Sequence, residues 1–367
     1  MIRHILSGAA VVAGLCGAVS GQGLNQTSGP WVMEQSGTTA GLRGIHAAGG
    51  GVAWASGTNG TVLRTEDGGY EWQSCGMPPE AEKLDFRGIW AWGDNTAIVM
   101  SSGTGDLSRL YKTTDGCSHW TLLYTNPDKE GFWDAVVFLS RQRGYLLGDP
   151  VGGRFAFFTT NNGGVAWTRS STEGLAASPG AAGVFAASNS SLLGSEREPT
   201  AFGTGGAMYY AQQFSAPSRL PGPPGTYVSR KLWTHVMVPL ANDGDTAGIF
   251  SLGWREGATP GYGSMLVAVG GDYTKPDVSA GTAAWSSDGG KTWTAAAKPP
   301  HGFRSAVAWD ADLKAWIAAG TNGSDISWDD GRTWVPLDDG TWNALSLPWV
   351  VGPGGRIAKL DPGKLPK

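Results

Sequence analysis

Short runs of apolar residues, separated by turns rich in glycine and polar side chains, recur along the chain. No segment carries a convincing apolar stripe of the helical period, so the runs predict short β-strands. In the first part of the chain they fall into groups of four. The predicted strands are 42–47, 52–57, 61–65 and 71–75 in the first group, 86–90, 97–101, 110–113 and 119–123 in the second, and 133–138, 144–148, 155–160 and 166–169 in the third. Four strands per repeat is the organisation of a β-propeller blade.

A motif of the form Ser/Thr-x-Asp/Asn-x-Gly-x-x-Trp follows the third strand of each of these groups and returns later in the chain. Its copies are 65–72, 113–120, 160–167, 286–293 and 327–334, and in the second one Cys117 takes the glycine position. The Asp or Asn side chain can accept the N–H groups of a tight turn, and the Trp opens the next strand and can pack between sheets. A motif repeated on many sheets cannot lie at one active site, so we interpret it as structural. The structural residues it predicts are Asp67, Trp72, Asp115, Trp120, Asn162, Trp167, Asp288, Trp293, Asp329 and Trp334.

The fourth repeat has lost the motif but keeps the frame around it. Residues 203–211 align with 57–65, and the segment 214–225, rich in proline and glycine, replaces the turn. The fifth repeat carries an additional loop, 271–281, between its second and third strands.

The two ends of the chain complement each other. Three strands follow the last motif, at 343–347, 349–352 and 356–360, and the segment 30–33 resembles 333–336 and can supply the missing fourth. This exchange leaves no open sheet edge. We therefore predict an all-β fold, a seven-bladed β-propeller of four-stranded blades closed by the N-terminal strand. The predicted boundaries are a signal peptide at 1–20, a linker at 21–29, the propeller at 30–362 and a tail at 363–367.

The N-terminus reads as a secretory signal peptide. Arg3 precedes an apolar stretch, 5–15, and the small residues Ala18 and Ser20 fit a cleavage site. The stretch is too short for a transmembrane helix, which needs about 20 apolar residues. Lipid attachment at Cys16 is a weaker alternative, because a small residue rather than Leu15 is expected before it. We therefore expect a periplasmic or secreted protein without a membrane span in the mature chain.

Two cysteines, Cys75 and Cys117, remain after removal of the signal peptide. They fall on neighbouring repeats, and cysteines in an oxidising compartment often pair. A disulfide and two unpaired thiols both stay open at this point.

Composition excludes several classes of function. The formal net charge of −4, with no basic run, argues against a nucleic-acid partner. No nucleotide-binding loop or nucleophile elbow lies at a credible position. The histidines of the mature chain show no metal-ligand spacing, so we predict no metal and no cofactor; they are His46, His119, His235 and His301. We expect a monomer.

The repeated motif resembles the Asp-box, or BNR-repeat, of the sialidase-like propellers. The arrangement of the repeats, over about residues 31–360, is most similar to the photosystem II assembly and stability factor family and its bacterial relatives. That resemblance implies a non-enzymatic propeller with an arginine-rich patch for protein binding. The motif is shared by sialidases, other glycoside hydrolases, sorting receptors and assembly factors, and fold alone does not settle function.

Arginines recur where the innermost strand of several blades begins. Arg43, Arg87 and Arg304 follow an apolar residue in blades one, two and six, and Asn343 holds the matching position in blade seven. These blades are contiguous in the ring, so we expect the guanidinium groups to converge on one mouth of the channel and to bind a protein or a small anionic or glycan ligand. The alternative is that they pair with local acids such as Asp85.

Three aspartates are candidates for the same face. Asp149 and Asp272 follow the second strands of blades three and five, and Asp134 lies near the ring position of blade three. Carboxylates across a channel can hydrolyse a glycosidic bond if their separation is suitable, so a glycoside hydrolase is the alternative function. Loop aspartates are more often turn residues. The Phe-Arg-Ile-Pro signature of sialidases is absent, since 86–89 lies in the wrong blade and lacks the proline.

Overall fold

The structure is a computed structural model that describes residues 29–171, 173–177, 183–194, 200–217, 227–256 and 264–366. The predicted signal peptide, with Cys16, and all but the last residue of the linker lie outside these ranges, so both stay predictions.

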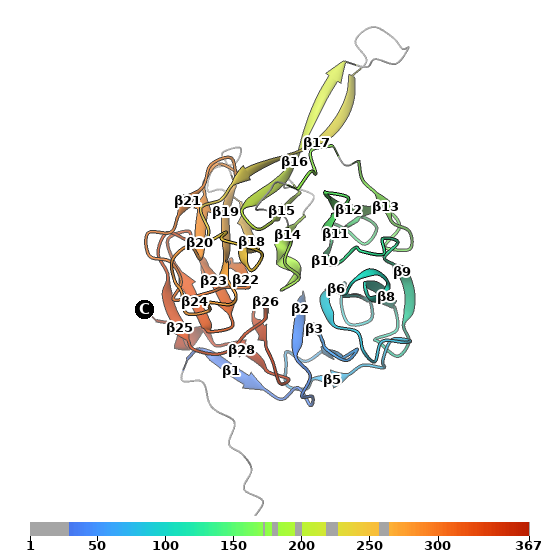
Figure 1. The fold of residues 1–367 in the computed structure, drawn as a ribbon. Coiled ribbons are helices and arrows are strands. Elements are labelled where there is room, and N and C mark those ends of the chain that lie inside the picture. Colours follow the sequence, from blue (N-terminus) through green and yellow to red (C-terminus); the bar gives the residue numbers. More distant parts are fainter. Residues whose placement is uncertain are drawn as a thin grey trace, which may run out of the picture.

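Seven four-stranded antiparallel sheets are arranged around a central axis, which confirms the predicted seven-bladed propeller (Figure 1). Blades one to three comprise β2 (Leu42–Gly49), β3 (Val52–Gly57), β4 (Val62–Thr65) and β5 (Gln73–Ser74); β6 (Phe86–Ala91), β7 (Ala97–Ser101), β8 (Arg109–Thr113) and β9 (Thr121–Thr125); and β10 (Trp133–Phe138), β11 (Gly144–Val151), β12 (Arg154–Thr160) and β13 (Thr168–Arg169). Blades four to six comprise β14 (Leu192–Leu193), β15 (Ala201–Gly203), β16 (Ala207–Pro217) and β17 (Tyr227–Met237); β18 (Ala247–Arg255), β19 (Met265–Asp272), β20 (Ala283–Ser286) and β21 (Thr294–Ala295); and β22 (Ala306–Asp310), β23 (Ala315–Gly320), β24 (Gly323–Ser327) and β25 (Val335–Asp338).

The seventh blade is built from both ends of the chain. It combines β26 (Ala344–Ser346), β27 (Trp349–Val351) and β28 (Ile357–Leu360) with β1 (Trp31–Glu34), and Trp31 pairs with Leu360 across the seam. Hydrogen bonds reinforce the closure, because Glu34 Oε2 accepts the indole N–H of Trp72 at 2.8 Å and that of Trp349 at 3.1 Å. The predicted strand exchange is confirmed.

The Asp-box motifs support turns. In blade one the Thr65 hydroxyl donates to Asp67 Oδ1 (2.8 Å) and accepts the N–H of Gly69 (3.0 Å), and Asp67 Oδ1 accepts the N–H of Glu71 (3.1 Å). The other four copies repeat this network. The motif tryptophans are buried or half-buried between blades. Each motif's Asp or Asn side chain is therefore occupied by its own turn.

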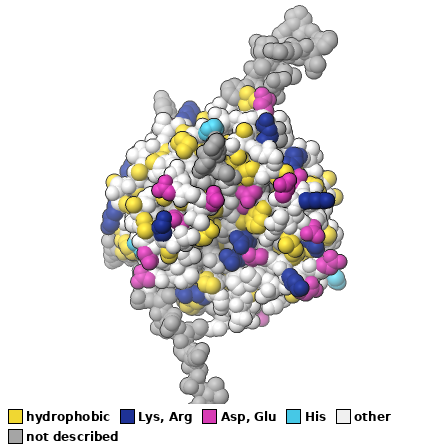
Figure 2. Space-filling model, in the orientation of Figure 1, with side chains coloured by type: hydrophobic (Ala, Val, Ile, Leu, Met, Phe, Trp, Pro, Cys, Tyr) yellow, Lys and Arg dark blue, Asp and Glu magenta, His cyan; other side chains and the backbone are white. Residues whose placement is uncertain are grey.

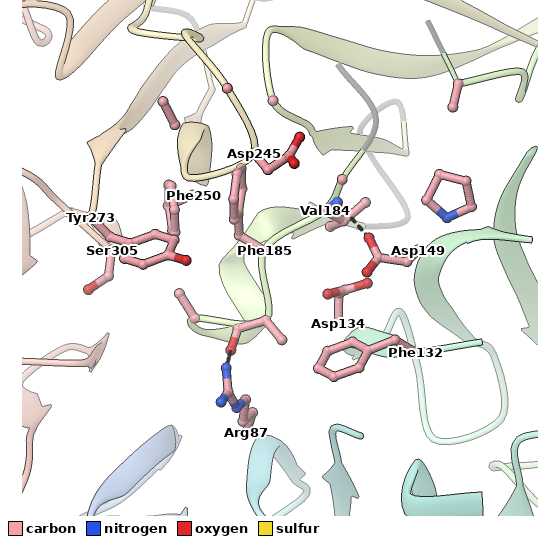
Figure 3. Close-up of a pocket in the computed structure, with 18 of the residues that line it drawn as sticks. Arg87, Phe132, Asp134, Asp149, Val184, Phe185, Asp245, Phe250, Tyr273 and Ser305 are labelled. Atoms are coloured by element: carbon pink, nitrogen blue, oxygen red, sulfur yellow. Dashed lines mark hydrogen bonds between the residues drawn. The ribbon is translucent and has the colours of Figure 1, made fainter. Parts of the chain in front are cut away.

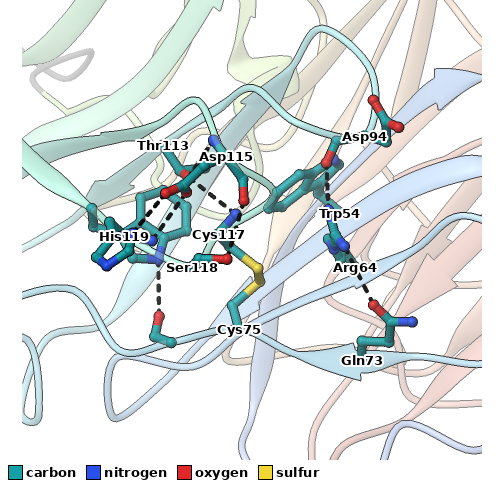
Figure 4. The surroundings of a disulfide bond; sticks show 12 residues. Trp54, Arg64, Gln73, Cys75, Asp94, Thr113, Asp115, Cys117, Ser118 and His119 are labelled. Atoms are coloured by element: carbon teal, nitrogen blue, oxygen red, sulfur yellow. Dashed lines mark hydrogen bonds and ion pairs between the residues drawn. A yellow bond between two sulfur atoms is a disulfide. The ribbon is translucent and has the colours of Figure 1, made fainter.

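Cys75 and Cys117 form a disulfide that joins the edge of blade one to the Asp-box turn of blade two (Figure 4). Cys117 has a φ of +65°, in the left-handed region that glycine occupies in the other motif copies, where Gly69 has a φ of +94°. The departure of the second motif from the glycine pattern is thus the disulfide cysteine itself.

Blade four departs most from the repeat. Its strands β16 and β17 pair along their whole length, from Ala207 with Met237 to Pro217 with Tyr227, and extend beyond the ring (Figure 1). This hairpin takes the place of the missing Asp-box turn.

Candidate functional site

A cavity of about 990 Å³ occupies the centre of the ring and draws residues from all seven blades. Basic and acidic side chains gather near the centre of the molecule in the space-filling view (Figure 2). One structurally equivalent position, near the start of each innermost strand, contributes to the lining in six blades. Its occupants are Arg43, Arg87, Asp134, Phe250, Ser305 and Asn343.

A β-bulge aims this position at the axis. The pairing of the innermost strand with the next one shifts at Arg43, Arg87, Asp134 and Phe250. A bulge leaves one residue out of the ladder and redirects its side chain. The fold therefore gives each of these blades one site at which the sequence can place a chosen group in the cavity.

Arg304 does not occupy this position, and the prediction that it joins the other two arginines is wrong. The N–H of Arg304 donates to a carbonyl of the preceding blade (3.0 Å), as does the N–H of Leu42 (3.1 Å). Arg304 is therefore the counterpart of Leu42, and Ser305 that of Arg43. A shift of one residue along a strand moves the side chain to the other face. Arg304 is fully buried and ion-paired with Asp325, also fully buried, so it has no surface for a ligand.

Arg43 and Arg87 do lie together in the cavity, with Asp85 between them. Arg87 Nε donates to Asp85 Oδ2 at 2.8 Å, and Arg43 Nε lies 3.9 Å from Asp85 Oδ1. Their side chains keep 36 % and 29 % exposure. Burial lowers the pKa of Arg43, and the neighbouring Arg87 lowers it further against the attraction of Asp85. The arginines therefore pair with a local acid, as the second alternative predicted, but two cations share one carboxylate. Their part in ligand binding stays a prediction.

Asn343 completes this side of the cavity from blade seven. Its amide Nδ2 donates to the carbonyl of Leu42 at 2.7 Å, which fixes the side chain beside blade one. Its part in ligand binding stays a prediction.

Two carboxyl groups face the cavity from blade three, that of the buried Asp134 and that of the half-buried Asp149. Asp134 and Asp149 lie beside each other and point into the same space (Figure 3). Burial raises the pKa of Asp134 well above its ordinary value, the charge of Asp149 raises it further, and Arg87 opposes both. Burial also raises the pKa of Asp149, although Oδ1 accepts the N–H of Val184 at 2.9 Å. This side of the cavity is acidic.

Asp272 is not part of this acidic side. It does not line the cavity; it accepts hydrogen bonds from the N–H and the hydroxyl of Thr274 (3.0 and 2.7 Å) and pairs with Lys275 (3.0 Å). Its hydrogen bonds with Thr274 and Lys275 lower its pKa strongly. Asp272 is a turn residue, so the prediction that it shares the cavity face with Asp134 and Asp149 is wrong.

An irregular segment crosses the channel and lies along one end of this cavity. We call residues 183–191 the plug; it includes a 3₁₀ turn, η2 (Asn189–Ser191). Its Ala186 carbonyl accepts a hydrogen bond from Arg87 Nη1 at 3.2 Å, and Phe185 stacks on Phe250 with ring centroids 3.8 Å apart. A second cavity of about 260 Å³ also borders the plug. The plug thus divides the channel and forms the floor of the larger cavity.

Several cavity residues carry no signal in the repeat pattern. Asp245 and Tyr273 come from loops at the ends of β18 and β19, and the rings of Phe132, Phe185 and Phe250 surround the charged groups (Figure 3). The one sequence feature that could have pointed to the plug is the long interval between the third motif and the first strand of blade four.

The described residues contain no helix long and apolar enough to cross a membrane. The same residues hold no group of three or more His, Cys, Asp or Glu side chains placed to bind a metal ion.

Comparisons with known proteins agree with the architecture. No family model matches the chain. The photosystem II assembly lipoprotein Ycf48 of Synechococcus sp. (strain CC9902) is 28 % identical over 170 residues, which are 45 % of this chain and 47 % of that protein, so the match spans about half of this relative. A structure of YCF48 from Cyanidioschyzon merolae matches with a TM-score of 0.60 and 18 % identity, over 91 % of this chain and 99 % of the other. A structure described as YCF48 bound to D1 peptide matches with a TM-score of 0.57 and 17 % identity, over 90 % and 96 %. The chain is a Ycf48-like seven-bladed β-propeller.

Proposed function

We propose that this protein is a non-enzymatic scaffold that binds a segment of a partner protein in the central cavity, with an anionic group of the segment on Arg43 and Arg87. The observation that carries the proposal is the arginine pair. Two guanidinium groups share the single carboxylate of Asp85 and remain partly exposed inside a cavity of about 990 Å³. Planar guanidinium groups hold carboxylates through paired hydrogen bonds. Cavities of about 300–1,000 Å³ are the size of typical ligand sites.

The relatives support a binding role. One structure with this fold is described as YCF48 bound to D1 peptide, and the curated relative is named as an assembly lipoprotein. We extend to this chain the general role of peptide binding and not the identity of the peptide. The hydrolase alternative loses one of its three candidate aspartates, because Asp272 belongs to a turn.

We place this activity outside the cytoplasm. Disulfides persist in oxidising compartments, and Cys75 pairs with Cys117 in this fold. The apolar N-terminal stretch of the sequence is consistent with export.

A display library of random heptapeptides, selected against the immobilised propeller, tests the proposal. We expect enrichment of peptides with Asp, Glu or a free carboxylate. The double variant Arg43→Gln/Arg87→Gln should bind them at least about tenfold more weakly, because a hydrogen bond to a charged group is worth about 1.5–3 kcal/mol. Arg141→Gln is the matched control, since Arg141 is exposed and outside the cavity lining. Failure to enrich any peptide, or equal binding by the double variant, would refute the proposal.

A further inference from the structure

Asp134 is a buried polar side chain whose carboxyl group makes no well-formed hydrogen bond within the part of the chain that the structure describes, although the nearby Asp149 N–H lowers its pKa slightly. It is 1 % exposed, and neither carboxyl oxygen has a hydrogen-bond partner among the described residues. Leaving a buried acceptor unsatisfied costs about 1–3 kcal/mol, and more when the group is charged. Such a group in a folded protein calls for a physical explanation. Because Asp134 lines the cavity, that explanation can be a ligand.

A second and a third acid border the same space. The Asp149 side chain is held by the Val184 N–H of the plug, and its carboxyl faces that of Asp134 (Figure 3). Asp245, which is exposed, points into the cavity from the blade-five loop. Two neighbouring carboxyls disfavour a second negative charge unless a cation lies between them.

Arg87, the one cation of the described residues that influences the Asp134 carboxyl, does not fill this role. Arg87 lies close enough to influence Asp134 electrostatically, but its Nε bonds Asp85 and its Nη1 bonds the Ala186 carbonyl. The cavity is therefore divided by charge, with Arg43 and Arg87 on blades one and two and the acids Asp134, Asp149 and Asp245 on blades three and five.

The surroundings favour a long organic cation. The ring of Phe132 lies beside Asp134. The rings of Phe185 and Phe250 stack on each other at another part of the cavity wall (Figure 3). Lysine and arginine bury their methylene stems along such apolar surfaces while the charged end reaches polar partners. The described residues hold no group of three or more His, Cys, Asp or Glu side chains placed to bind a metal ion, which favours an organic cation over a divalent metal ion.

We propose that Asp134 and Asp149 form a subsite for the ammonium or guanidinium group of a basic side chain, so that the bound segment carries a basic residue next to its anionic group. The proposal rests on the proposed peptide-binding function and specifies its ligand as a segment with both charges. The arginine pair holds the anion, the acids hold the cation, and the aromatic rings cover the stem between them.

Binding of the basic residue is coupled to release of a proton. In the free protein burial and the charge of Asp149 raise the pKa of Asp134 against the effect of Arg87, which favours its protonated form. The other charged groups of the cavity are Arg43, Glu130 and Asp245. A ligand cation between the two carboxyls stabilises the ionised form and displaces the proton to solvent.

The heptapeptide selection is repeated with Asp134→Asn and Asp149→Asn. These substitutions keep the side-chain shape, and the amide introduced by Asp149→Asn would still offer its carbonyl oxygen to the Val184 N–H. We expect wild-type selections to enrich Lys or Arg together with an acidic group, and both variants to lose the basic preference but keep the acidic one. Asp243→Asn is the matched control on the blade-five loop, since Asp243 is exposed and does not line the cavity. Asp245→Asn serves as a further test if a buried variant does not fold.

One selected peptide, synthesised with lysine and with norleucine at the basic position, gives the quantitative test by calorimetry. Wild type should bind the norleucine peptide about tenfold more weakly than the lysine peptide. The Asp134→Asn variant should bind the two peptides equally well. Calorimetry in buffers of different ionisation enthalpy should show a net release of protons when the lysine peptide binds wild type, and this release should vanish in Asp134→Asn. Enrichment of acidic peptides without a basic residue would overturn the subsite and leave the peptide-binding function standing. No enrichment at all would overturn both.

Discussion

The buried pair of Arg304 and Asp325 allows a direct test of how blade six is built. Arg304 occupies the core position that Leu42 fills in blade one, and Asp325 precedes its Asp-box by the same two residues as Leu63 does. Both charged side chains are fully buried, with Arg304 Nε donating to Asp325 Oδ2 at 2.6 Å. Blade six thus places an ion pair where blade one packs two leucines.

The loss of stability in each single variant depends on which partner of the ion pair stays buried without the other. Removing one partner of a buried ion pair costs about 3–5 kcal/mol, whereas replacing both by apolar residues is often neutral or stabilising. Asp325→Leu leaves Arg304 beside the Asn322 side chain, the Phe303 carbonyl and the His301 ring, none of which is a carboxylate, so we expect the full loss. Arg304→Leu leaves Asp325 still bonded to His301 Nδ1 at 2.9 Å, so we expect a smaller loss.

The loss in Arg304→Leu should depend on pH. The hydrogen bond to Asp325 raises the pKa of His301 above its ordinary value. A histidine with a raised pKa stabilises the fold fully below its unfolded pKa of about 6.5 and loses this contribution as pH rises through the folded pKa. In Arg304→Leu the protonated His301 is the remaining cation beside Asp325 among the described residues, so the variant should be relatively less stable at pH 8.5 than at pH 6.

Equilibrium urea denaturation followed by tryptophan fluorescence measures these differences. The double variant Arg304→Leu/Asp325→Leu reproduces the leucine pair of blade one and should recover most of the stability lost by Asp325→Leu. The double-mutant cycle then gives a coupling of several kcal/mol. If both single variants are as stable as wild type, or the double variant loses the sum of the two, the buried-pair reasoning is wrong.

Two further predictions concern one covalent and one polar link between blades. Cys75→Ser removes a disulfide between residues 42 positions apart in the sequence, and it should lower the free energy of unfolding by about 4 kcal/mol in the chain-entropy account. Denaturation with and without reductant measures this loss. Reductant should leave the stability of the variant unchanged. Glu34→Ala removes the acceptor of two indole N–H groups and should cost at least about 2 kcal/mol. Limited proteolysis should release the N-terminal strand earlier in Glu34→Ala than in Glu34→Gln, which keeps an acceptor. Equal release rates in the two variants would contradict the proposed stabilisation of the closure by the Glu34 hydrogen bonds.

Much of the fold was predictable because short sequence motifs mark the strands and turns of each repeat. The Asp-box turns, the strand runs between them and the likeness of 30–33 to 333–336 fixed the number of blades and the closure. The position of Asn343 in the cavity also followed from this alignment.

The error at Arg304 shows where local signals fail. The pair Phe303-Arg304 looks like Phe86-Arg87, and only the hydrogen bond of the Arg304 N–H to blade five shows that it is offset by one residue. A usable sign was present in the third strand, where Asp325 replaces an apolar core residue. A buried acid needs a cation nearby, and Arg304 was the available one.

The plug was not predictable, because it is held by contacts between distant parts of the chain, and it supplies the last prediction. The Asn189 side chain donates to the Ile89 carbonyl (2.7 Å) and accepts the Val136 N–H (3.2 Å), so one amide bridges blades two and three. Asn189→Ala leaves both backbone groups without this partner. Asn189 borders the smaller cavity, where water can replace part of the loss, so we expect a cost of about 1–2 kcal/mol. Loosening the plug also releases the Ala186 carbonyl that positions Arg87, so peptide affinity should fall although Asn189 does not line the larger cavity. Asn95→Ala, at an exposed position of blade two, is the control. Unchanged affinity in a destabilised Asn189→Ala would show that the plug supports the fold but does not shape the binding site.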